Sequence, residues 1–426
     1  MNEVVVIGTG MTRFGKFFDR SVRSLAEEAV TEALGDAGIG PEAVEFTAFA
    51  NAAGGILQCQ EMIRGQSALH HTGLLGSPIV NVENACASAS SAVHLAWQSI
   101  ASGSAEIALA VGAEKLTHAD KMRSFAAIGT AIDLEDLSGI RDMLSTVLLG
   151  WPPPAAPAGG TPDAAASAGS AASGGSGGKL QSSPFMQVYA QMTQLYLSRS
   201  GGTKEDLAAV SVKNHRHASE NPKAQYRDLV TIDEVLASRI VADPLTVLMC
   251  SPIADGAAAL VLATPEAAAR LGVPAVKVLA SVLASGRDRS LDEPSVAERA
   301  SLRAYEQAGI GPEDLNVLEV HDAAATAELQ LYEELGLCPA GEGPKLLASG
   351  ATTIGGRVPV NPSGGLLSRG HPIGATGCGQ LVELADQLRG RCGARQVEGA
   401  RFALAENGGG FIGADAAATV ITILGS

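Results

Sequence analysis

One short segment of this chain occurs twice, and the repeat limits the folds that the chain can adopt. Residues 37–44 read Ala-Gly-Ile-Gly-Pro-Glu-Ala-Val, and residues 308–315 read Ala-Gly-Ile-Gly-Pro-Glu-Asp-Leu. Each copy has a helical pattern before it and a strand-like run after it, at 45–49 and 317–320. Each copy therefore predicts a helix stopped by glycine, a proline turn and then a strand. The same unit twice, far apart in the chain, indicates two similar halves.

The helix before each copy has an apolar face. In the first helix Leu25, Val30 and Leu34 lie on one side. In the second helix Leu302, Tyr305 and Ala308 lie on one side. We expect these faces to pack against the sheet of their own half.

Length and charge narrow the class of protein. A chain of 426 residues exceeds one ordinary core, so two or three domains are expected. The sequence contains no apolar run as long as a membrane span, and it enters a strand at residues 4–8 without a basic leader. The net charge of −15 argues against nucleic acid and membranes as partners. We expect a cytoplasmic protein.

The cysteines do not form a metal-binding pattern. There are six, scattered through the chain without a Cys-x-x-Cys pair. Free thiols in a long chain are typical of a reducing compartment. We therefore expect no metal site, and we expect Cys338, Cys378 and Cys392 to be structural.

Cys86 is the first candidate for chemistry. It follows the apolar run 78–82 and precedes a string of alanine and serine, a pattern that predicts a strand turning sharply into a helix. The unpaired N–H groups and dipole at a helix start lower the pKa of a thiol, and the thiolate is the nucleophile. Taken alone, the same residue could be a buried, inert cysteine.

His371 is the second candidate. It lies in the glycine-rich segment 370–377, just after Asn-Pro-Ser-Gly-Gly at 361–365. A histidine in such a loop can activate a cysteine because its unperturbed pKa is near neutral. Histidine before proline can also serve only to form a turn.

Together these segments resemble a known family. Asn-Ala-Cys-Ala-Ser-Ala around Cys86 and Gly-His-Pro-Ile-Gly-Ala-Thr-Gly at 370–377 are similar to the nucleophile and histidine motifs of the thiolases. Residues 319–324 resemble the His-Asp-Cys-Phe motif of the sterol-carrier-protein type of thiolase. Residues 251–259 resemble the segment of thiolases that enters the strand leading into the second half of the chain. The resemblance is to an acetyl-CoA acetyltransferase-like subgroup of the superfamily.

The resemblance implies the thiolase fold, an α/β fold of two duplicated βαβαβαββ halves in a five-layer αβαβα sandwich with an inserted loop domain. We assign residues 1–117 and 249–270 to the amino-terminal half, 118–248 to the loop domain and 271–426 to the carboxy-terminal half.

The loop domain contains two unusual stretches. Residues 151–179 are nearly all proline, alanine, glycine, serine and threonine, a composition typical of a disordered segment. Such a segment could act as a lid over the active site or could have no function. Between 199 and 227 basic residues outnumber acidic ones, as in a solvated helix face or a patch for the phosphates of coenzyme A. The resemblance favours coenzyme A. The basic residues are Arg199, Lys204, Lys213, Arg216, Lys223 and Arg227.

The resemblance also implies a mechanism. Cys86 would take the acyl group after His371 removes its proton, and the backbone N–H groups of Cys86 and Gly408 would hold the first oxyanion. His321 and His371 would hold the enolate of the second substrate. Ser251 would contact the substrate. Coenzyme A is then a substrate, with no bound cofactor.

The chain departs from the family at the acid/base cysteine. The motif after His321 has Ala323 where the sterol-carrier type has cysteine, and the segment 406–410 reads Glu-Asn-Gly-Gly-Gly in place of Cys-x-Gly-Gly-Gly. Glu406 therefore becomes the candidate acid/base, since burial can raise the pKa of a carboxyl toward neutrality. Alternatively, Glu406 hydrogen-bonds His321 or His371 and only orients the imidazole.

Three functions remain open on this sequence. The first is an acyl-CoA C-acyltransferase that makes or cleaves a β-ketoacyl-CoA through acyl-Cys86; the others are a retro-aldolase of the thiolase fold and an inactive scaffold. The retained Cys86 and His371 favour the first. The resemblance implies a homodimer or tetramer, and a small zinc-ribbon and OB-fold acyl-CoA-associated subunit as a further partner.

Overall fold

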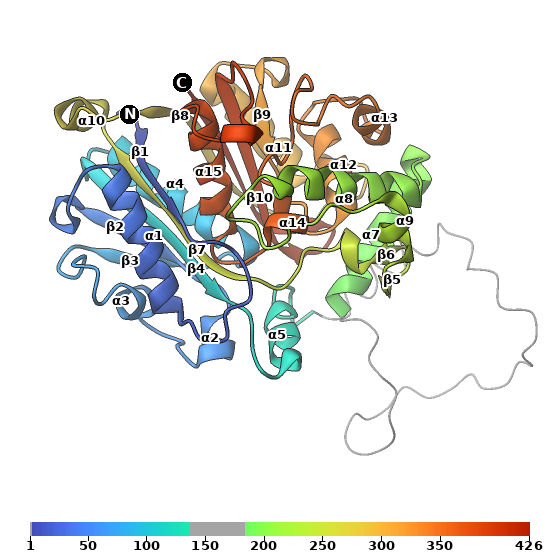
Figure 1. The fold of residues 1–426 in the computed structure, drawn as a ribbon, viewed down its shortest axis with the longest axis horizontal. Helices are drawn as coiled ribbons and strands as arrows, with labels where there is room; N and C mark the ends of the chain where they lie inside the picture. The colour runs from blue at the N-terminus through green and yellow to red at the C-terminus, as the bar shows by residue number, and fades with distance from the viewer. Residues whose placement is uncertain (1, 137–183) are drawn as a thin grey trace, which may run out of the picture.

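The structure is a computed structural model that describes residues 2–136 and 184–426 (Figure 1). The low-complexity stretch expected at 151–179 lies outside the described residues. In the part of the chain that the structure describes, no helix is long and apolar enough to cross a membrane.

The elements follow the chain in three groups. The first comprises β1 (Val5–Met11), α1 (Val22–Asp36), η1 (Pro41–Ala43), β2 (Phe46–Ala50), α2 (Gly54–Gln58), α3 (Arg64–Ala68), β3 (Ile79–Val82), η2 (Ala85–Ala87), α4 (Ser88–Ala101), β4 (Ile107–Lys115) and α5 (Lys121–Ile128). The second comprises α7 (Pro184–Ser200), α8 (Lys204–Ser219), α9 (Ile232–Ala237), β5 (Ile240–Ala242), β6 (Leu245–Thr246), η3 (Val247–Met249), β7 (Asp255–Ala263) and α10 (Pro265–Leu271). The third comprises β8 (Val276–Ser285), α11 (Val296–Ala308), η4 (Pro312–Asp314), β9 (Val317–Glu319), α12 (Ala325–Glu334), α13 (Gly343–Ala348), α14 (Gly365–Arg369), α15 (Thr376–Leu388), η5 (Gly393–Arg395), β10 (Phe402–Ile412) and β11 (Asp415–Gly425).

Nine of the described strands form one mixed sheet in the order β3-β2-β4-β7-β1-β8-β11-β10-β9. Read from each outer edge, the two halves have matching orders, because β2, β4, β7 and β1 correspond to β9, β10, β11 and β8. The counterpart of β3 is a single parallel bridge between Leu318 and Val360. Only two residue pairs, Val5 with Lys277 and Val6 with Val276, join β1 to β8 in the described structure. The duplication predicted from the sequence is confirmed.

The repeated segments have the predicted local structure. After α1 and α11 the chain turns through Gly38 and Gly309 at φ of 64° and 68°, where glycine is favoured. Each turn leads through a 3₁₀ turn that begins with proline into β2 or β9. The expected face of α11 is wrong at Leu302, which is 62% exposed. The helix buries residues such as Ala297, Ser301 and Ala304, and Leu302 lies about 100° around the axis from Ser301.

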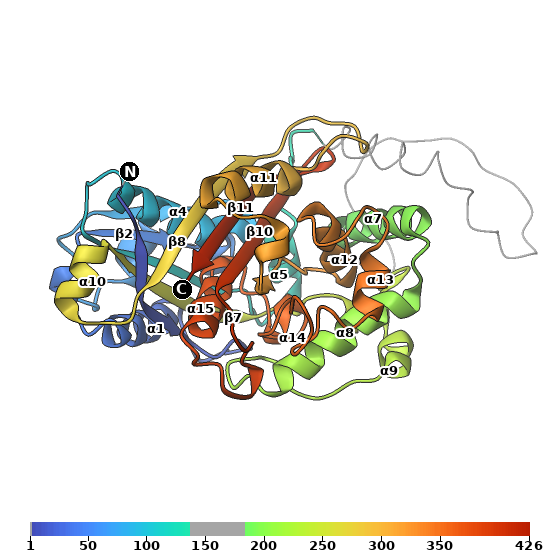
Figure 2. The ribbon, with the colours of Figure 1, turned by 90° about the horizontal axis from the view of Figure 1, so that it is seen from above.

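The buried apolar side chains define five layers, α/β/α/β/α. The middle layer is α4 and α15, whose Ala92 and Leu381 share a core with Leu260 of β7 and Ala403 of β10 (Figure 1). One outer layer contains α1, which packs on the amino-terminal strands. The other contains α11 and α12 on the carboxy-terminal strands, and Figure 2 shows α11 lying across β11 and β10. The expected thiolase-type sandwich is confirmed.

The middle layer is packed through small residues. A Cβ on Gly377 of α15 would lie 2.5 Å from the Ser90 nitrogen of α4. A Cβ on Gly112 of β4 would lie 2.4 Å from the carbonyl oxygen of Gly374. Such distances leave no room for a side chain, so α4 and α15 are held in close contact.

The loop-domain boundaries stay a prediction. In the described part of this region, α8 packs against α12, α13 and α14 of the carboxy-terminal half, and α7 contacts α12. Helix α8 begins with a capping box in which Thr203 and Asp206 satisfy each other's backbone N–H groups.

We predict that Gly377→Ala destabilises the protein by about 1–3 kcal/mol, because the new methyl group meets backbone in a filled layer. Gly35→Ala is the matched control, since Gly35 is also helical and has no atom within 4 Å of its Cβ position. We expect that control to stabilise by about 0.5–1 kcal/mol. Denaturant midpoints measure both changes. Equal effects of the two substitutions would refute the packing argument.

Candidate active site

Cys86 lies at the turn between β3 and α4. It occupies the 3₁₀ turn η2, directly after Ala85, whose φ of 47° is unusual for a residue with a side chain. The Glu83 carboxylate accepts the Ala85 N–H at 2.6 Å, and the Ala85 carbonyl accepts the Ser88 hydroxyl at 2.6 Å. These bonds hold the strained turn and direct the thiol toward the carboxy-terminal half. The predicted strand-to-helix turn at Cys86 is therefore present.

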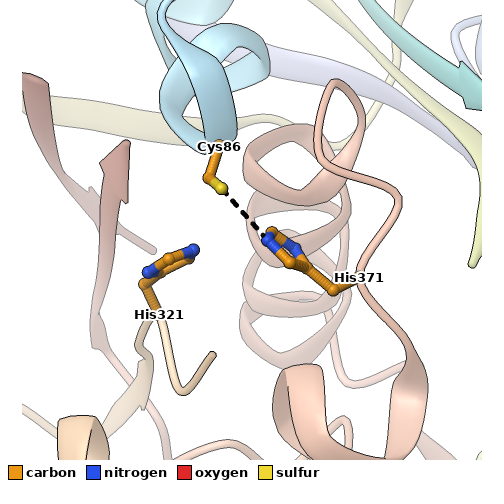
Figure 3. Close-up of side chains that lie close together, drawn as sticks. All are labelled: Cys86, His321 and His371. Carbon is orange, nitrogen blue, oxygen red and sulfur yellow. Dashed lines mark hydrogen bonds between the residues drawn. The ribbon is translucent and has the colours of Figure 1, made fainter. Parts of the chain in front are cut away.

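His371 contacts the thiol. Its Nε2 lies 3.2 Å from the Cys86 sulfur, and its Nδ1 lies 2.7 Å from the Thr376 hydroxyl (Figure 3). The Thr376 hydroxyl donates to the Pro372 carbonyl, so it accepts from Nδ1–H of the imidazole. This fixes the tautomer with a free electron pair on Nε2, facing the S–H group. Thr376 has a positioning role that the sequence reasoning missed, although the residue lies within the histidine motif.

The expected lowering of the Cys86 pKa is wrong for this structure. Burial raises the pKa of the thiol to about 12, although the backbone N–H groups of Gly410 and of Cys86 itself act in the opposite direction. Burial also holds the pKa of His371 well below its ordinary value, with smaller contributions from the nearby His321 and Arg369. At neutral pH the pair is therefore thiol and neutral imidazole, and ionisation of Cys86 requires proton transfer to His371.

His321 is the third member of this group. Its ring is edge-on to that of His371, with centroids 5.1 Å apart, and Figure 3 shows both rings directed toward Cys86. Burial lowers the pKa of His321 to about 4. Among the described residues, its Nε2 has no hydrogen-bond partner.

Glu406 approaches His321 through the backbone. Its Oε2 accepts the His321 N–H at 3.0 Å, so the alternative in which it bonds an imidazole is not the observed geometry. Burial raises the pKa of Glu406 to about 8. The carboxyl is therefore mainly protonated near neutral pH and can both give and take a proton there.

The N–H group beside the sulfur belongs to Gly410. This residue has φ of 64° and no ladder partner between the pairs Gly409–Ala418 and Phe411–Ala416, so its N–H is free to face Cys86. Gly408, the residue expected for this role, instead pairs with Thr419 inside the β10–β11 ladder and lines a cavity next to Cys86. The motif at 406–410 correctly predicted which strand provides the N–H group. It did not predict that Gly410, and not Gly408, is the glycine without a partner in the β10–β11 ladder.

A cavity of about 410 Å³ opens over Cys86 and His371 and is lined mostly by apolar side chains; we call it the apolar cavity. Ser251 lines it, with its N–H bonded to the Ala323 carbonyl at 3.0 Å. Ala323, at the position of the missing cysteine, also lines it, so this position presents a methyl group in place of a thiol. The apolar lining includes Leu116, Phe125, Ile128, Met186, Ile373 and Phe411.

Glu114 is a second residue that the sequence reasoning missed. Its buried carboxylate accepts the backbone N–H groups of Ala52, Ala53 and Gly374 and the side-chain amide of Asn51. It therefore ties the loop after β2 to the loop of His371. A single glutamate at the end of a strand carries no sequence signal for this role.

A buried ion pair lies under the two histidines. Glu319 and Arg369 are joined at 3.1 Å and are fully buried, and each stands two residues before a histidine, His321 or His371. Glu319 also accepts the N–H and hydroxyl of Ser363. The pair links β9 to α14 and so fixes the spacing of the two histidines.

The six basic residues of 199–227 do not form one free cationic surface. Lys213 is buried against Glu328 at 2.8 Å, and Lys223 bonds Glu32 at 2.5 Å. Lys204 and Arg199 face Asp243 and Asp292, and Arg227 bonds the Ser219 carbonyl. Lys213 is buried and cannot contribute to a surface patch, whereas a phosphate-binding patch among the other basic residues of this region stays a prediction.

Cys86, His321 and His371 also form the one group of side chains among the described residues that could together bind a metal ion. The donor atoms of Cys86, His321 and His371 lie within 4.8 Å of one another. Their hydrogen bond and tautomer suit proton transfer between sulfur and nitrogen.

Comparisons with known proteins agree with this geometry. Residues 4–149 match the thiolase amino-terminal domain, and residues 283–425 match the thiolase C-terminal domain-like family. The chain is 37% identical to benzoylsuccinyl-CoA thiolase subunit BbsB of Thauera aromatica over 93% of this chain and 91% of that protein. It is 37% identical to an acetyl-CoA acetyltransferase of Methanothermobacter thermautotrophicus over 96% and 97% of the two chains.

Solved structures share the fold over the whole chain. The Ltp2–ChsH2(DUF35) aldolase superposes with a TM-score of 0.74 at 25% identity, covering 100% of this chain and 98% of that one. The Acat5 thiolase of Ascaris suum, crystallised with coenzyme A, gives a TM-score of 0.67 at 21% identity over 100% of both chains.

Proposed function

This chain belongs to the thiolase superfamily of acyl-CoA enzymes, and on that premise we propose that it is a C-acyltransferase that makes or cleaves a β-ketoacyl-CoA through acyl-Cys86. The observation that carries the proposal is the contact of 3.2 Å between the sulfur and Nε2 of His371, with the tautomer fixed by Thr376. Acyl transfer requires a thiol that can pass its proton to an unprotonated imidazole nitrogen, whereas an inactive scaffold or an aldolase does not require one.

The first half-reaction would use a neutral pair. His371 takes the proton of Cys86 as the sulfur attacks the acyl carbonyl, and the same proton then protonates the coenzyme A thiolate that leaves. The backbone N–H groups of Cys86 and Gly410 stabilise the oxyanion, with Gly410 in the role expected of Gly408. Ser251 and Ala323 line the same apolar cavity and are proposed to border the substrate.

The second half-reaction would need an enolate and a proton carrier. His321 and His371 face each other over the site and are proposed to hold the enolate oxygen of the second acyl-CoA, His371 in the state in which its Nε2 carries a proton. Glu406, with its pKa raised to about 8, is proposed to move the α-proton in place of the cysteine of other thiolases.

The second candidate is retro-aldol cleavage. It is favoured by two observations, the alanine at position 323 in place of an acid/base cysteine and the similarity to a thiolase-fold aldolase. That aldolase is named for an Ltp2 and a ChsH2(DUF35) component, which supports our expectation of a small partner subunit for this chain. We propose coenzyme A as a substrate, in line with the thiolase structures that contain it.

We predict that Cys86→Ser abolishes acyl transfer and leaves the fold intact, because a serine hydroxyl is too weak an acid for His371 to ionise at neutral pH. Incubation with acetyl-CoA and mass spectrometry should find an acetyl adduct on Cys86 in the wild type and none in the variant. Cys59→Ser, at an exposed cysteine, is the control and should keep the adduct. Turnover that survives in Cys86→Ser would favour the aldolase.

We predict that Glu406→Gln slows exchange of the α-protons of an acyl-CoA in deuterated water by on the order of a hundredfold or more, while Cys86 is still acylated. Glutamine keeps the shape and the bond to the His321 N–H but cannot carry a proton. Asp386→Asn is the control and should exchange at the wild-type rate, because burial raises the pKa of Asp386 to about 6 as well while this residue lines neither of the two cavities beside Cys86. Exchange at the wild-type rate in Glu406→Gln would show that Glu406 is not the acid/base.

We predict at least a homodimer, formed across β3. This strand is the edge of the sheet in the described structure, Val80 on it is 40% exposed, and Met62 and Ile63 nearby are 77% and 64% exposed. Val80→Lys should weaken the dimer in sedimentation at micromolar concentration, and Leu302→Lys on α11 should not. A wild-type protein that sediments as a monomer would contradict the prediction.

A further inference from the structure

Cys86, His321 and His371 come from three segments that are far apart in the sequence. Cys86 lies in η2, His321 follows β9, and His371 lies between α14 and α15. The fold directs the two imidazole rings toward the thiol, as Figure 3 shows, and the donor atoms of all three residues lie within 4.8 Å of one another. The sequence has no paired-cysteine signal for such a group, because only the folded chain brings these donors together.

The spacing of these donors suits a zinc ion. Zinc binds sulfur at about 2.3 Å and imidazole nitrogen at about 2.0–2.1 Å, and a tetrahedral arrangement then places the two donors about 3.5 Å apart. The Cys86 sulfur and Nε2 of His371 lie 3.2 Å apart. Binding an ion between them therefore needs only small movements of the side chains.

Both histidines have a nitrogen that is available to a metal ion. His371 donates Nδ1–H to the Thr376 hydroxyl at 2.7 Å, which leaves the electron pair of Nε2 facing the sulfur. Histidines that bind metal ions usually donate their other ring N–H in this way, because the bond fixes the orientation of the ring. His321 is 8% exposed, and its Nε2 has no hydrogen-bond partner among the described residues. An unsatisfied buried nitrogen destabilises the folded state, and a metal ion would satisfy it.

A second cavity, of about 570 Å³, gives access to this group and is lined by both Cys86 and His321. It reaches Asp292, whose side chain is 90% exposed, so it extends to the surface of the protein. The acidic side chains of its lining outnumber the arginines, which are Arg199 and Arg289. An excess of acidic groups along a cavity attracts cations. The other acidic residues of the lining are Glu293, Glu298, Glu333, Glu334, Glu406 and Asp415.

We propose that Zn²⁺ binds Cys86, His321 and His371 and acts as a reversible inhibitor. The thiol releases its proton to the solvent, its sulfur binds the ion as thiolate, and each imidazole binds through the electron pair of one nitrogen. Water from the cavity takes the fourth position, as at other zinc sites with three protein ligands. One thiolate and two imidazoles favour Zn²⁺ over Mg²⁺ and Ca²⁺, which take oxygen ligands. The binding is independent of the acyl-transfer function proposed above, whereas the inhibition rests on that function, since a metal-bound sulfur cannot attack an acyl group.

Two titrations of the metal-free, full-length protein test the binding. Calorimetry measures the binding of Zn²⁺, and absorption spectroscopy measures that of Co²⁺, which replaces Zn²⁺ at such sites and absorbs by charge transfer when a thiolate binds it. We expect one ion per chain and a thiolate–cobalt band, and we expect excess Mg²⁺ to displace neither ion. Cys86→Ser should remove the band, because a serine hydroxyl stays protonated.

Two further variants test the histidines. His321→Ala removes a ligand and Thr376→Val removes the acceptor that orients His371, so each should weaken Zn²⁺ binding by about 10–100-fold. His71→Ala is the matched control and should leave the affinity unchanged. The Nδ1 atoms of His70 and His71 lie 3.1 Å apart on the surface, and this exposed pair is an alternative place for an ion. Denaturant midpoints measured without metal show whether each variant is folded.

Three results would overturn the metal site. The first is a wild-type protein without the thiolate–cobalt band, and the second is a band that survives in Cys86→Ser. The third is equal weakening of Zn²⁺ binding in His321→Ala and His71→Ala.

The inhibition is measured separately, as the formation of an acetyl adduct on Cys86 of the wild-type protein from acetyl-CoA. Bound Zn²⁺ should suppress the adduct and a chelator should restore it, whereas an unchanged adduct would refute the inhibition. Zinc binding by a protein that forms no adduct even without metal would remove the proposed acyl transfer and keep the metal site. Adduct formation by a protein that binds no zinc would remove the metal site and keep the acyl transfer.

Discussion

The close packing of the middle layer is the constraint on which the site depends. Cys86 precedes α4 and His371 precedes α15, so the distance between sulfur and imidazole is set by how closely these helices approach. Gly377 meets the Ser90 nitrogen, and Gly409 of β10 has its Cβ position 2.2 Å from the Asn84 carbonyl oxygen. A methyl group at either glycine would move one catalytic loop relative to the other, and a contact of 3.2 Å tolerates little movement.

The same close packing excludes water and so sets the protonation states. Burial raises the pKa of Cys86 to about 12 and that of Glu406 to about 8, while it lowers the pKa of both histidines. The resting site therefore carries almost no charge. Proton transfer from Cys86 to His371 creates a thiolate and an imidazolium in a poorly solvated cavity, so it is favourable only as the sulfur attacks the acyl carbonyl and backbone N–H groups stabilise the oxyanion.

The sequence predicted what depends on local pattern. The repeated Gly-Ile-Gly-Pro segments indicated the turns after α1 and α11, and the two motifs located Cys86 and His371. It did not predict what depends on contacts between distant segments. Glu114 and Thr376 act through bonds to loops, Gly410 rather than Gly408 leaves the ladder, and Lys213 is buried against Glu328, an acid far along the chain.

The two reactions proposed for this site differ in which group faces Glu406. Its Oε2 is taken by the His321 N–H, so Oε1 is the oxygen left to meet a substrate near Gly408 and Thr419. If an α-carbon occupies that space, proton transfer to Glu406 generates the enolate of a thiolase reaction. If a β-hydroxyl of an acyl-CoA occupies it, loss of that proton breaks the bond between the α- and β-carbons and leaves an enolate for His321 and His371. A carboxyl serves either substrate, because oxygen and carbon acids both transfer protons to a base whose pKa is near neutral. The identity of the acyl chain, more than the catalytic groups, then decides which bond is broken.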